Sequence, residues 1–103
     1  MIASRKHVLT LLCLILTVTS AHAFTYTGQK LAGKAKITIE QARAIALKAH
    51  PGKITDEELE REKGGSGLRY SFDILNGKVT QEVGVDAKNG ELLENAAEGP
   101  NAD

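Results

Sequence analysis

The alternation of apolar and polar positions is clearest in the second half of the chain. Between residues 68 and 85, apolar side chains recur at every second position on both sides of Asn76-Gly77. Such a pair favours a two-residue type I′ turn, because both central positions of that turn need a positive φ angle. The pattern therefore predicts a β-hairpin with a fixed register. The predicted pairs are Leu75–Lys78, Ile74–Val79, Phe72–Gln81, Tyr70–Val83 and Leu68–Val85.

The two faces of this hairpin differ in polarity. One face carries Tyr70 and Phe72, which are expected to be buried against a helix. The other face is polar and mixed in charge, and it is predicted to be displayed to solvent. A protein partner is expected to bind this face reversibly or to pair with a strand edge of the sheet. Its residues are Arg69, Ser71, Asp73, Thr80 and Glu82. Arg69 is expected opposite Gly84, with its side chain diagonal to Glu82 and Asp86.

An earlier segment changes to helical periodicity. Thr38 is a candidate N-cap, and Gln41 stands three residues later, as in a capping box. Pro51-Gly52 predicts the end of the helix. Small and branched apolar residues then share one face at helical spacing, which suits a helix that lies close on a sheet. They are Ile39, Ala42, Ile45, Ala46 and Ala49.

The remaining segments define the domain limits and leave one element open. Residues 53–63 read as a strand or as a short helix, and the strand is favoured because it leads directly into the hairpin. Leu92-Leu93 is a further short segment that follows a predicted turn at residues 86–90. The expected fold is α+β, with one N-terminal helix packed on a three- to four-stranded antiparallel meander. The domain is expected at residues 37–95, between a flexible lead-in at 24–36 and a disordered tail at 96–103.

The first 23 residues predict an export signal. Arg5 and Lys6 precede an apolar run at residues 8–18, and Ala21-His22-Ala23 forms a small-x-small cleavage site. The eleven residues of the run would cover roughly 16 Å as a helix, about half of what a membrane span needs. The mature chain is therefore expected to start at Phe24, to be periplasmic or secreted, and to have no membrane span.

Cleavage would also remove most of the reactive side chains. Without its first 23 residues the 103-residue chain keeps 80 residues, with no cysteine and with His50 as the sole histidine. A zinc site needs several Cys or His ligands. The acidic run at residues 56–62 is interrupted by a base, and in the segment 86–91 Lys88 stands where a calcium loop needs an oxygen ligand. We therefore expect no metal, no cofactor and no catalytic residues, and the chain is predicted not to be an enzyme.

Charge narrows the choice of partners. The predicted mature chain has eleven basic and thirteen acidic residues, a formal net charge of about −2. No basic face stands out, so nucleic acid is not an expected partner.

The runs KITIEQARAIALKAHPGKI and LRYSFDILNGKVTQEVGVDAKNGELL resemble the PepSY domain. The resemblance covers about residues 37–93 and is most specific at 83–93, where Asn89 replaces the more usual threonine before the turn glycine. It implies one helix on an antiparallel sheet, no catalytic residues, and a role in inhibiting or regulating peptidases of the cell envelope. The chain is accordingly expected to be an exported, non-catalytic module that inhibits or chaperones an envelope peptidase.

Two other functions stay open at this stage. One is a periplasmic sensor or accessory module that binds a small ligand or a membrane receptor, which would predict a concave pocket. The other is a purely structural or assembly role.

Overall fold

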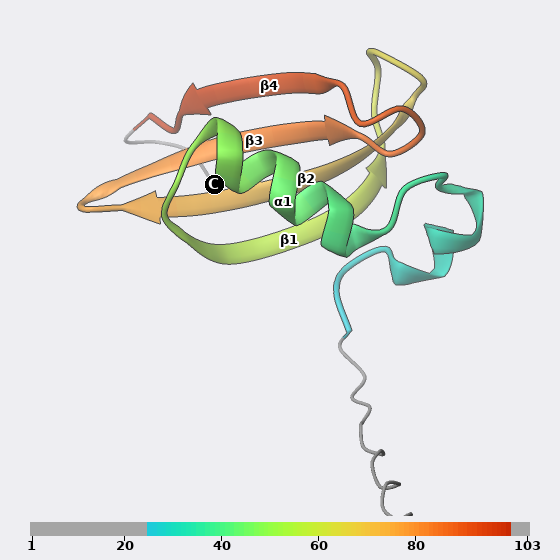
Figure 1. The fold of residues 1–103 in the computed structure, drawn as a ribbon, viewed down its shortest axis with the longest axis horizontal. Helices are drawn as coiled ribbons and strands as arrows, with labels where there is room; N and C mark the ends of the chain where they lie inside the picture. Colours follow the sequence, from blue (N-terminus) through green and yellow to red (C-terminus); the bar gives the residue numbers. More distant parts are fainter. Residues whose placement is uncertain (1–24, 100–103) are drawn as a thin grey trace, which may run out of the picture.

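A single α-helix lies across one face of a four-stranded antiparallel sheet (Figure 1). The computed structural model describes residues 25–99, so the predicted export signal at 1–23 and the last four residues of the predicted tail lie outside the described residues. The helix is α1 (Ile39–Ala49), and a 3₁₀-helix, η3 (Gln29–Lys34), precedes it. The strands are β1 (Lys53–Arg61), β2 (Leu68–Asn76), β3 (Val79–Asp86) and β4 (Leu92–Ala97), in that spatial order. The predicted α+β meander is therefore confirmed.

The helix begins and ends as its sequence predicts. The Thr38 side chain accepts a hydrogen bond from the Gln41 N–H, and the Gln41 side chain accepts one from the Thr38 N–H. This capping box satisfies two of the backbone donors that a helix N-terminus leaves unpaired. The side chains of Ile39, Ala42 and Ala46 are buried under the helix, whereas Ala49 at its last position is exposed.

The ambiguous segment is a strand with a bulge. The β1–β2 pairing shifts between Ile54 and Asp56, which leaves Thr55 as the extra residue of β1. Ile54 and Leu59 are an odd number of positions apart, so a regular strand would place them on opposite faces. The bulge reverses this parity, and both side chains pack with the core under α1.

The hairpin register differs by two residues from the prediction. Asn76 pairs with Val79, and the two-residue loop is Gly77-Lys78 instead of Asn76-Gly77. The Asn76 side chain donates to the Pro51 carbonyl at 2.7 Å, which holds Asn76 in the strand. Gly77 takes the first loop position with φ 67°, a conformation that glycine adopts without steric cost. Since the shift is even, every side chain keeps its predicted face.

The core is a single cluster between α1 and the sheet. The Tyr70 and Phe72 side chains are each 1% exposed, which confirms their predicted burial. In the observed register Phe72 lies opposite Val83, and Tyr70 lies opposite Val85. The Tyr70 hydroxyl donates to the Ile37 carbonyl at 2.9 Å, so the polar end of this buried ring is satisfied.

A buried carboxylate holds the loops at one end of the sheet. Asp86 is fully buried, and its oxygens accept hydrogen bonds from the N–H and hydroxyl of Ser66 at 2.6 and 2.7 Å. They also accept the N–H groups of Lys88 and Asn89 at 2.8 and 3.3 Å. Asp86 thereby ties the 64–67 loop to the turn that leads into β4.

Both ends of the described chain are more regular than predicted. In place of a flexible lead-in, residues 25–36 include η3, and Thr27 forms a parallel bridge with Glu58 at the outer edge of β1. The predicted tail begins inside a strand, since β4 continues to Ala97 and the Glu98 N–H donates to the Thr80 carbonyl. Neither helix in the described part of the chain is both long and apolar enough to cross a bilayer.

Candidate partner-binding face

The face of the sheet turned away from α1 is dominated by carboxylates. Directly paired residues of neighbouring strands share a face, so the register places Asp56, Asp73 and Glu82 in one row. We call this surface the acidic face. Its carboxylates are Asp56, Glu58, Glu60, Glu62, Asp73, Glu82, Glu94 and Glu98. Arg69 is the cation among them, and Lys53 stands at the far end of the same face, opposite Leu75.

The structure brings the five predicted contact residues onto this face but exposes them less than expected. Arg69 and Ser71 are buried, at 8% and 7% exposure, and Asp73, Thr80 and Glu82 are half-buried. The expectation that Arg69 and Ser71 are displayed to solvent is therefore wrong, whereas Asp73, Thr80 and Glu82 remain partly exposed. The cause is that β1 and β4 flank the central hairpin and contribute long acidic side chains. The sequence does contain a signal for the carboxylates of β1. An acidic residue stands at every second position from 56 to 62, which in a strand places these side chains on one face.

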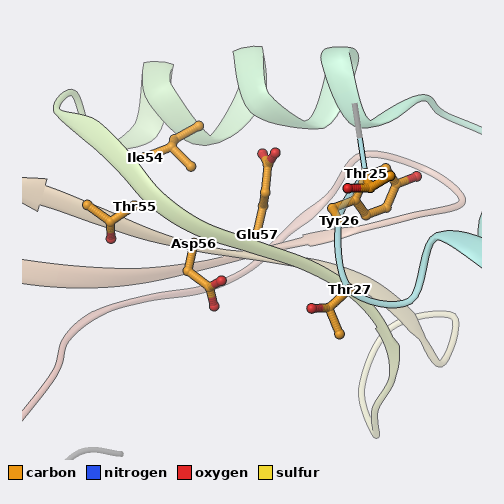
Figure 2. A pocket seen from close by; sticks show the side chains of 7 residues that line it. All are labelled: Thr25, Tyr26, Thr27, Ile54, Thr55, Asp56 and Glu57. Carbon is orange, nitrogen blue, oxygen red and sulfur yellow. The ribbon is translucent and has the colours of Figure 1, made fainter. Parts of the chain in front are cut away.

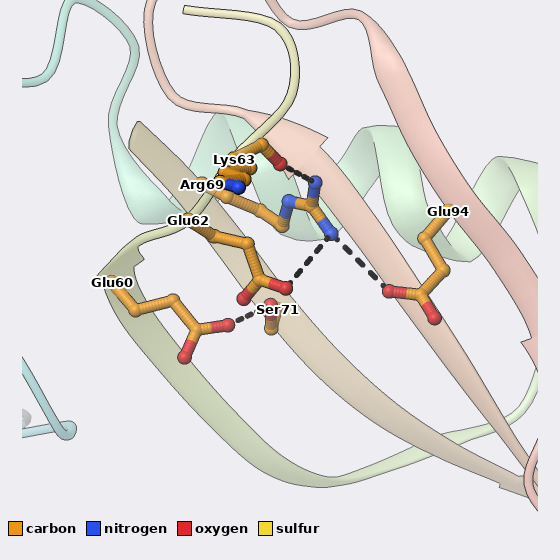
Figure 3. Close-up of polar contacts among 6 residues, drawn as sticks. All are labelled: Glu60, Glu62, Lys63, Arg69, Ser71 and Glu94. Atoms are coloured by element: carbon orange, nitrogen blue, oxygen red, sulfur yellow. Dashed lines mark hydrogen bonds and ion pairs between the residues drawn. The ribbon is translucent and has the colours of Figure 1, made fainter. Parts of the chain in front are cut away.

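Arg69 binds different partners from those predicted (Figure 3). Its guanidinium donates to the Lys63 carbonyl at 3.0 Å and to Glu94 at 3.3 Å, and it lies 3.9 Å from Glu62. The predicted partners were Glu82 and Asp86, and two causes explain the change. The register places Asp86 itself opposite Arg69, and the Asp86 carboxylate is already bound to Ser66.

A glycine on β3 lets the arginine lie flat on the sheet. A Cβ at Gly84 would stand 3.0 Å from Cδ of Arg69, so the absence of a side chain there leaves room for the arginine stem to reach β4. Beside it the Ser71 hydroxyl donates to Glu60 at 2.8 Å. Arg69 is thus engaged in internal contacts, and within residues 25–99 no ion pair is formed by Glu58 or Glu82.

Burial and mutual repulsion raise the pKa values of three of these carboxyl groups. For Glu58, desolvation comes first, followed by the negative charges of Glu60 and Asp56. For Asp73 the raised pKa comes from desolvation and then from Asp56, and a side-chain hydrogen bond with Glu98 acts in the opposite direction. The pKa of Glu82 is raised by desolvation and by Glu94 and Asp73. The face therefore holds anionic charge that the fold itself does not neutralise.

Three of the acidic side chains converge at one end of the face. One oxygen each from Asp73, Glu82 and Glu98 lies within 4.8 Å of the others, the one such group among the described residues. Carboxylate oxygens are ligands for hard divalent cations, but calcium takes six to eight oxygens. Three carboxylates supply only part of such a shell. The sequence alone does not predict this convergence, because Glu98 lies in the segment expected to be a disordered tail.

The helix-facing side of β1 carries a separate polar contact, and an open hollow lies along the outer edge of this strand. Arg43 of α1 pairs with both carboxylate oxygens of Glu57 at 2.8 Å, which fixes the helix to β1. Figure 2 shows Glu57 pointing toward α1 and Asp56 pointing to the other side of the strand. The hollow between β1 and the N-terminal segment has a volume of about 530 Å³ and is open to solvent. It is lined by Thr25, Tyr26, Thr27, Ile54, Thr55, Asp56 and Glu57.

This geometry defines a small α+β module with one covered and one uncovered sheet face. Residues 36–95 match the family model of the PepSY domain, described as the peptidase propeptide and YPEB domain. The chain therefore belongs to the PepSY family, as its sequence motifs predict. Comparison with curated proteins and with solved structures found no significant match.

Membership of this family sets the general class of the protein. PepSY domains are generally propeptide or inhibitor-like modules of peptidases, and they associate with peptidases or other proteins. They are typically non-catalytic, and they are typically found outside the cytoplasm.

Proposed function

We propose that this chain is an exported, non-catalytic module that binds and restrains an envelope peptidase through its acidic face. The observation that carries the proposal is the concentration of eight carboxylates on a sheet face that neither α1 nor the N-terminal segment covers. Family membership supplies the class of partner. The predicted contact residues Asp73, Thr80 and Glu82 lie within this face, whereas Arg69 and Ser71 would act beneath it by positioning acidic side chains.

The charge of the face sets the kind of contact. Half-buried carboxylates with raised pKa values gain from a cation, because a positive charge relieves both their desolvation and their repulsion. A complementary basic surface on the peptidase would be attracted at long range, and this attraction weakens as salt screens it. Binding should therefore be reversible and salt-sensitive.

The test is capture of partners from a periplasmic extract, followed by an inhibition assay on any captured peptidase. The informative variant is Glu58→Lys with Glu82→Lys, because substitution of the buried Arg69 would disturb the fold. The matched control is Glu40→Lys with Glu91→Lys, which changes the net charge equally at exposed positions that are not among the eight carboxylates of the acidic face. We expect the first variant to lose capture and inhibition and the control to keep both.

Two results would contradict the proposal. One is a captured set that contains no peptidase. The other is capture that the Glu58→Lys, Glu82→Lys variant retains while it stays folded by circular dichroism. Hydrolysis of a peptide by the highly purified chain, abolished by a point change, would overturn its non-catalytic part.

The hollow beside β1 supports a second candidate, an accessory module that binds a small ligand. Its volume of about 530 Å³ lies within the range of small-molecule sites. However, it is open to solvent, and its carboxylate Glu57 is already paired with Arg43. A thermal-shift screen of small metabolites separates the two candidates. A ligand whose stabilisation is lost on Ile54→Glu, but kept in Glu58→Lys, would favour the accessory function.

A further inference from the structure

The two edges of the sheet are not equivalent. At the β1 edge the Leu59 N–H donates to the Thr27 carbonyl at 2.8 Å, and Gly28 packs directly against the Leu59 carbonyl. The N-terminal segment therefore occupies the middle of that edge. At the other edge, β4 pairs with β3 on one side, and within residues 25–99 no segment pairs with its outer side.

The backbone of β4 is oriented to accept another strand. The Glu98 N–H donates to Thr80, and residues of an antiparallel pair alternate between bonding the partner and pointing away from it. Ala96 and Glu94 therefore bond β3, whereas Asn95 and Ala97 direct their N–H and C=O groups outward. Both residues are exposed. Edge strands are usually protected by charged side chains, proline, bulges or a covering loop. β4 has a bulge at Leu93 and a charge at Glu94, but residues 95–97 contain neither a charge nor a proline, and within residues 25–99 no strand pairs with their outer side.

The side chains along the β4 edge determine which kind of added strand would bind there. Glu94, Ala96 and Glu98 turn toward the acidic face, and Ala96 lies opposite Glu82 of β3. A long basic side chain on an added strand would pass over the small Ala96 to reach the Glu82 carboxylate, since neighbouring strands are only about 4.8 Å apart. On the other face, Leu92 is 42% exposed and offers an apolar contact. A second copy of this chain fits poorly, because pairing of two β4 strands would bring two acidic faces together.

We infer that the β4 edge binds an extended segment of a partner protein by strand addition, with basic residues at alternate positions facing Glu94, Glu82 and Glu98. Backbone bonds to Asn95 and Ala97 supply the affinity, and the alternating charges set the register. This inference rests on the proposed function for the origin of the segment, a basic extended stretch of the regulated peptidase.

The direct test needs no peptidase, so its failure is distinct from failure of the proposed function. The probe is the fluorescently labelled peptide TKVKVKT, titrated with the chain starting at Phe24 and followed by anisotropy. The control TVKKKVT has the same composition, but consecutive lysines cannot all face one side of a strand. We expect the control to bind about tenfold more weakly, and the binding of TKVKVKT to weaken as salt is raised.

Two changes test the edge itself. Ala97→Pro removes an outward N–H and keeps the β3 pairing, so it should abolish binding, whereas Ala97→Val should retain it. If Ala97→Pro does not fold, TKVKVKT with N-methyl groups on alternate residues tests the same hydrogen bonds from the peptide side. Equal binding of both peptides, or binding that survives either Ala97→Pro in a folded chain or N-methylation of TKVKVKT, overturns the inference. The inference is also overturned if TKVKVKT does not bind and the chain instead forms a dimer that Ala97→Pro dissociates, because the β4 edge would then bind a second copy of the chain.

Discussion

The fully buried carboxylate of Asp86 is the polar residue on which the fold depends most. Burial by itself would raise its pKa, but the hydrogen bonds from the Lys88 and Ser66 backbones, the Ser66 hydroxyl and the Asn89 backbone lower the pKa below its ordinary value. The charged form is thus the one that the folded chain stabilises. This residue lies in the most specific part of the family motif, and its structural role explains why a carboxylate is needed there.

Asp86→Asn is expected to reduce the free energy of unfolding by about 2–3 kcal/mol, because an amide N–H₂ would face the N–H donors that the carboxylate now accepts. Chemical denaturation at neutral pH measures the change. The control is Lys88→Ala, which keeps the backbone N–H that bonds Asp86 and should cost less than about 0.5 kcal/mol. Equal loss in both variants would contradict this account of Asp86.

Among the apolar residues, Phe72 is the one whose removal we expect to destabilise the fold most. It is 1% exposed and belongs to the core cluster between α1 and the sheet, so Phe72→Ala removes a large buried side chain and leaves a cavity. We expect a loss of about 3–5 kcal/mol, which would unfold much of a domain of this size at 37 °C. Circular dichroism during thermal unfolding measures the effect. A midpoint within a few degrees of the unchanged chain would mean that the core repacks around the site.

At the scale of elements, the N-terminal segment acts as part of the sheet. Tyr26 lies beside Tyr70, whose pKa is raised to about 12 by desolvation and then by Tyr26. Thr27 and Gly28 lie against β1 at Leu59. The segment thereby closes one sheet edge and leaves the β4 edge available, an asymmetry on which the inferred strand addition depends.

Gly28→Ala is expected to release this segment from β1. Gly28 has φ 82°, and an added Cβ would overlap the Leu59 carbonyl oxygen, so the alanine meets both backbone strain and a steric clash. Hydrogen exchange at the Leu59 amide should become faster, because its acceptor is the Thr27 carbonyl. Gly33→Ala is the matched control, since a Cβ there would meet nothing within 4 Å. Unchanged exchange at Leu59 in Gly28→Ala would contradict this closure of the β1 edge.

At the scale of the whole molecule, charge is distributed unevenly. The sequence has 13 basic and 13 acidic residues, yet eight carboxylates gather on one face of the sheet. Repulsion within that face opposes folding at neutral pH, and the bonds to Asp86 act in the opposite direction. The dependence of stability on pH should reveal both effects.

The raised pKa values of Glu58, Asp73 and Glu82 mean that the folded chain binds protons more tightly than the unfolded chain. Stability should therefore increase as the pH falls from 7 through these raised values toward 4.5, the ordinary value for glutamate. For Asp86 the sign is reversed. The stabilisation by the Asp86 carboxylate is complete at pH values above 3.8, the ordinary pKa of aspartate. It is lost as the pH falls through the lower pKa of Asp86 in the folded chain.

Thermal midpoints measured between pH 7 and pH 3 should thus pass through a maximum in mild acid. The double variant Glu58→Gln, Glu82→Gln removes two of the raised groups, so it should be more stable at pH 7 and show a flatter rise. Added NaCl should produce a similar gain in the unchanged chain, because it screens the same repulsion. A midpoint that falls steadily from pH 7 downward would contradict this electrostatic account.

The sequence by itself determined the helix α1, the two hairpin strands and the family. Helix caps, turn residues and the period of apolar positions act between neighbours a few residues apart, so Thr38, Gln41 and Pro51 define α1 without reference to the rest of the fold. Alternation likewise assigned Tyr70 and Phe72 to the core face, and this assignment survived an incorrect register because the error was an even number of residues.

Only the tertiary structure decided the register, the acidic face and the closed edge. The Asn76 bond to Pro51 joins residues 25 positions apart, and it moved the turn by one residue. The acidic face combines side chains from four strands, and its charge depends on which strands are neighbours and on the bulge at Thr55. Arg69 is buried because Gly84 and Glu94 meet it from other strands. Contacts between residues far apart in the chain produce no periodic pattern in the sequence. The acidic face is built by such contacts, so only the tertiary structure reveals it.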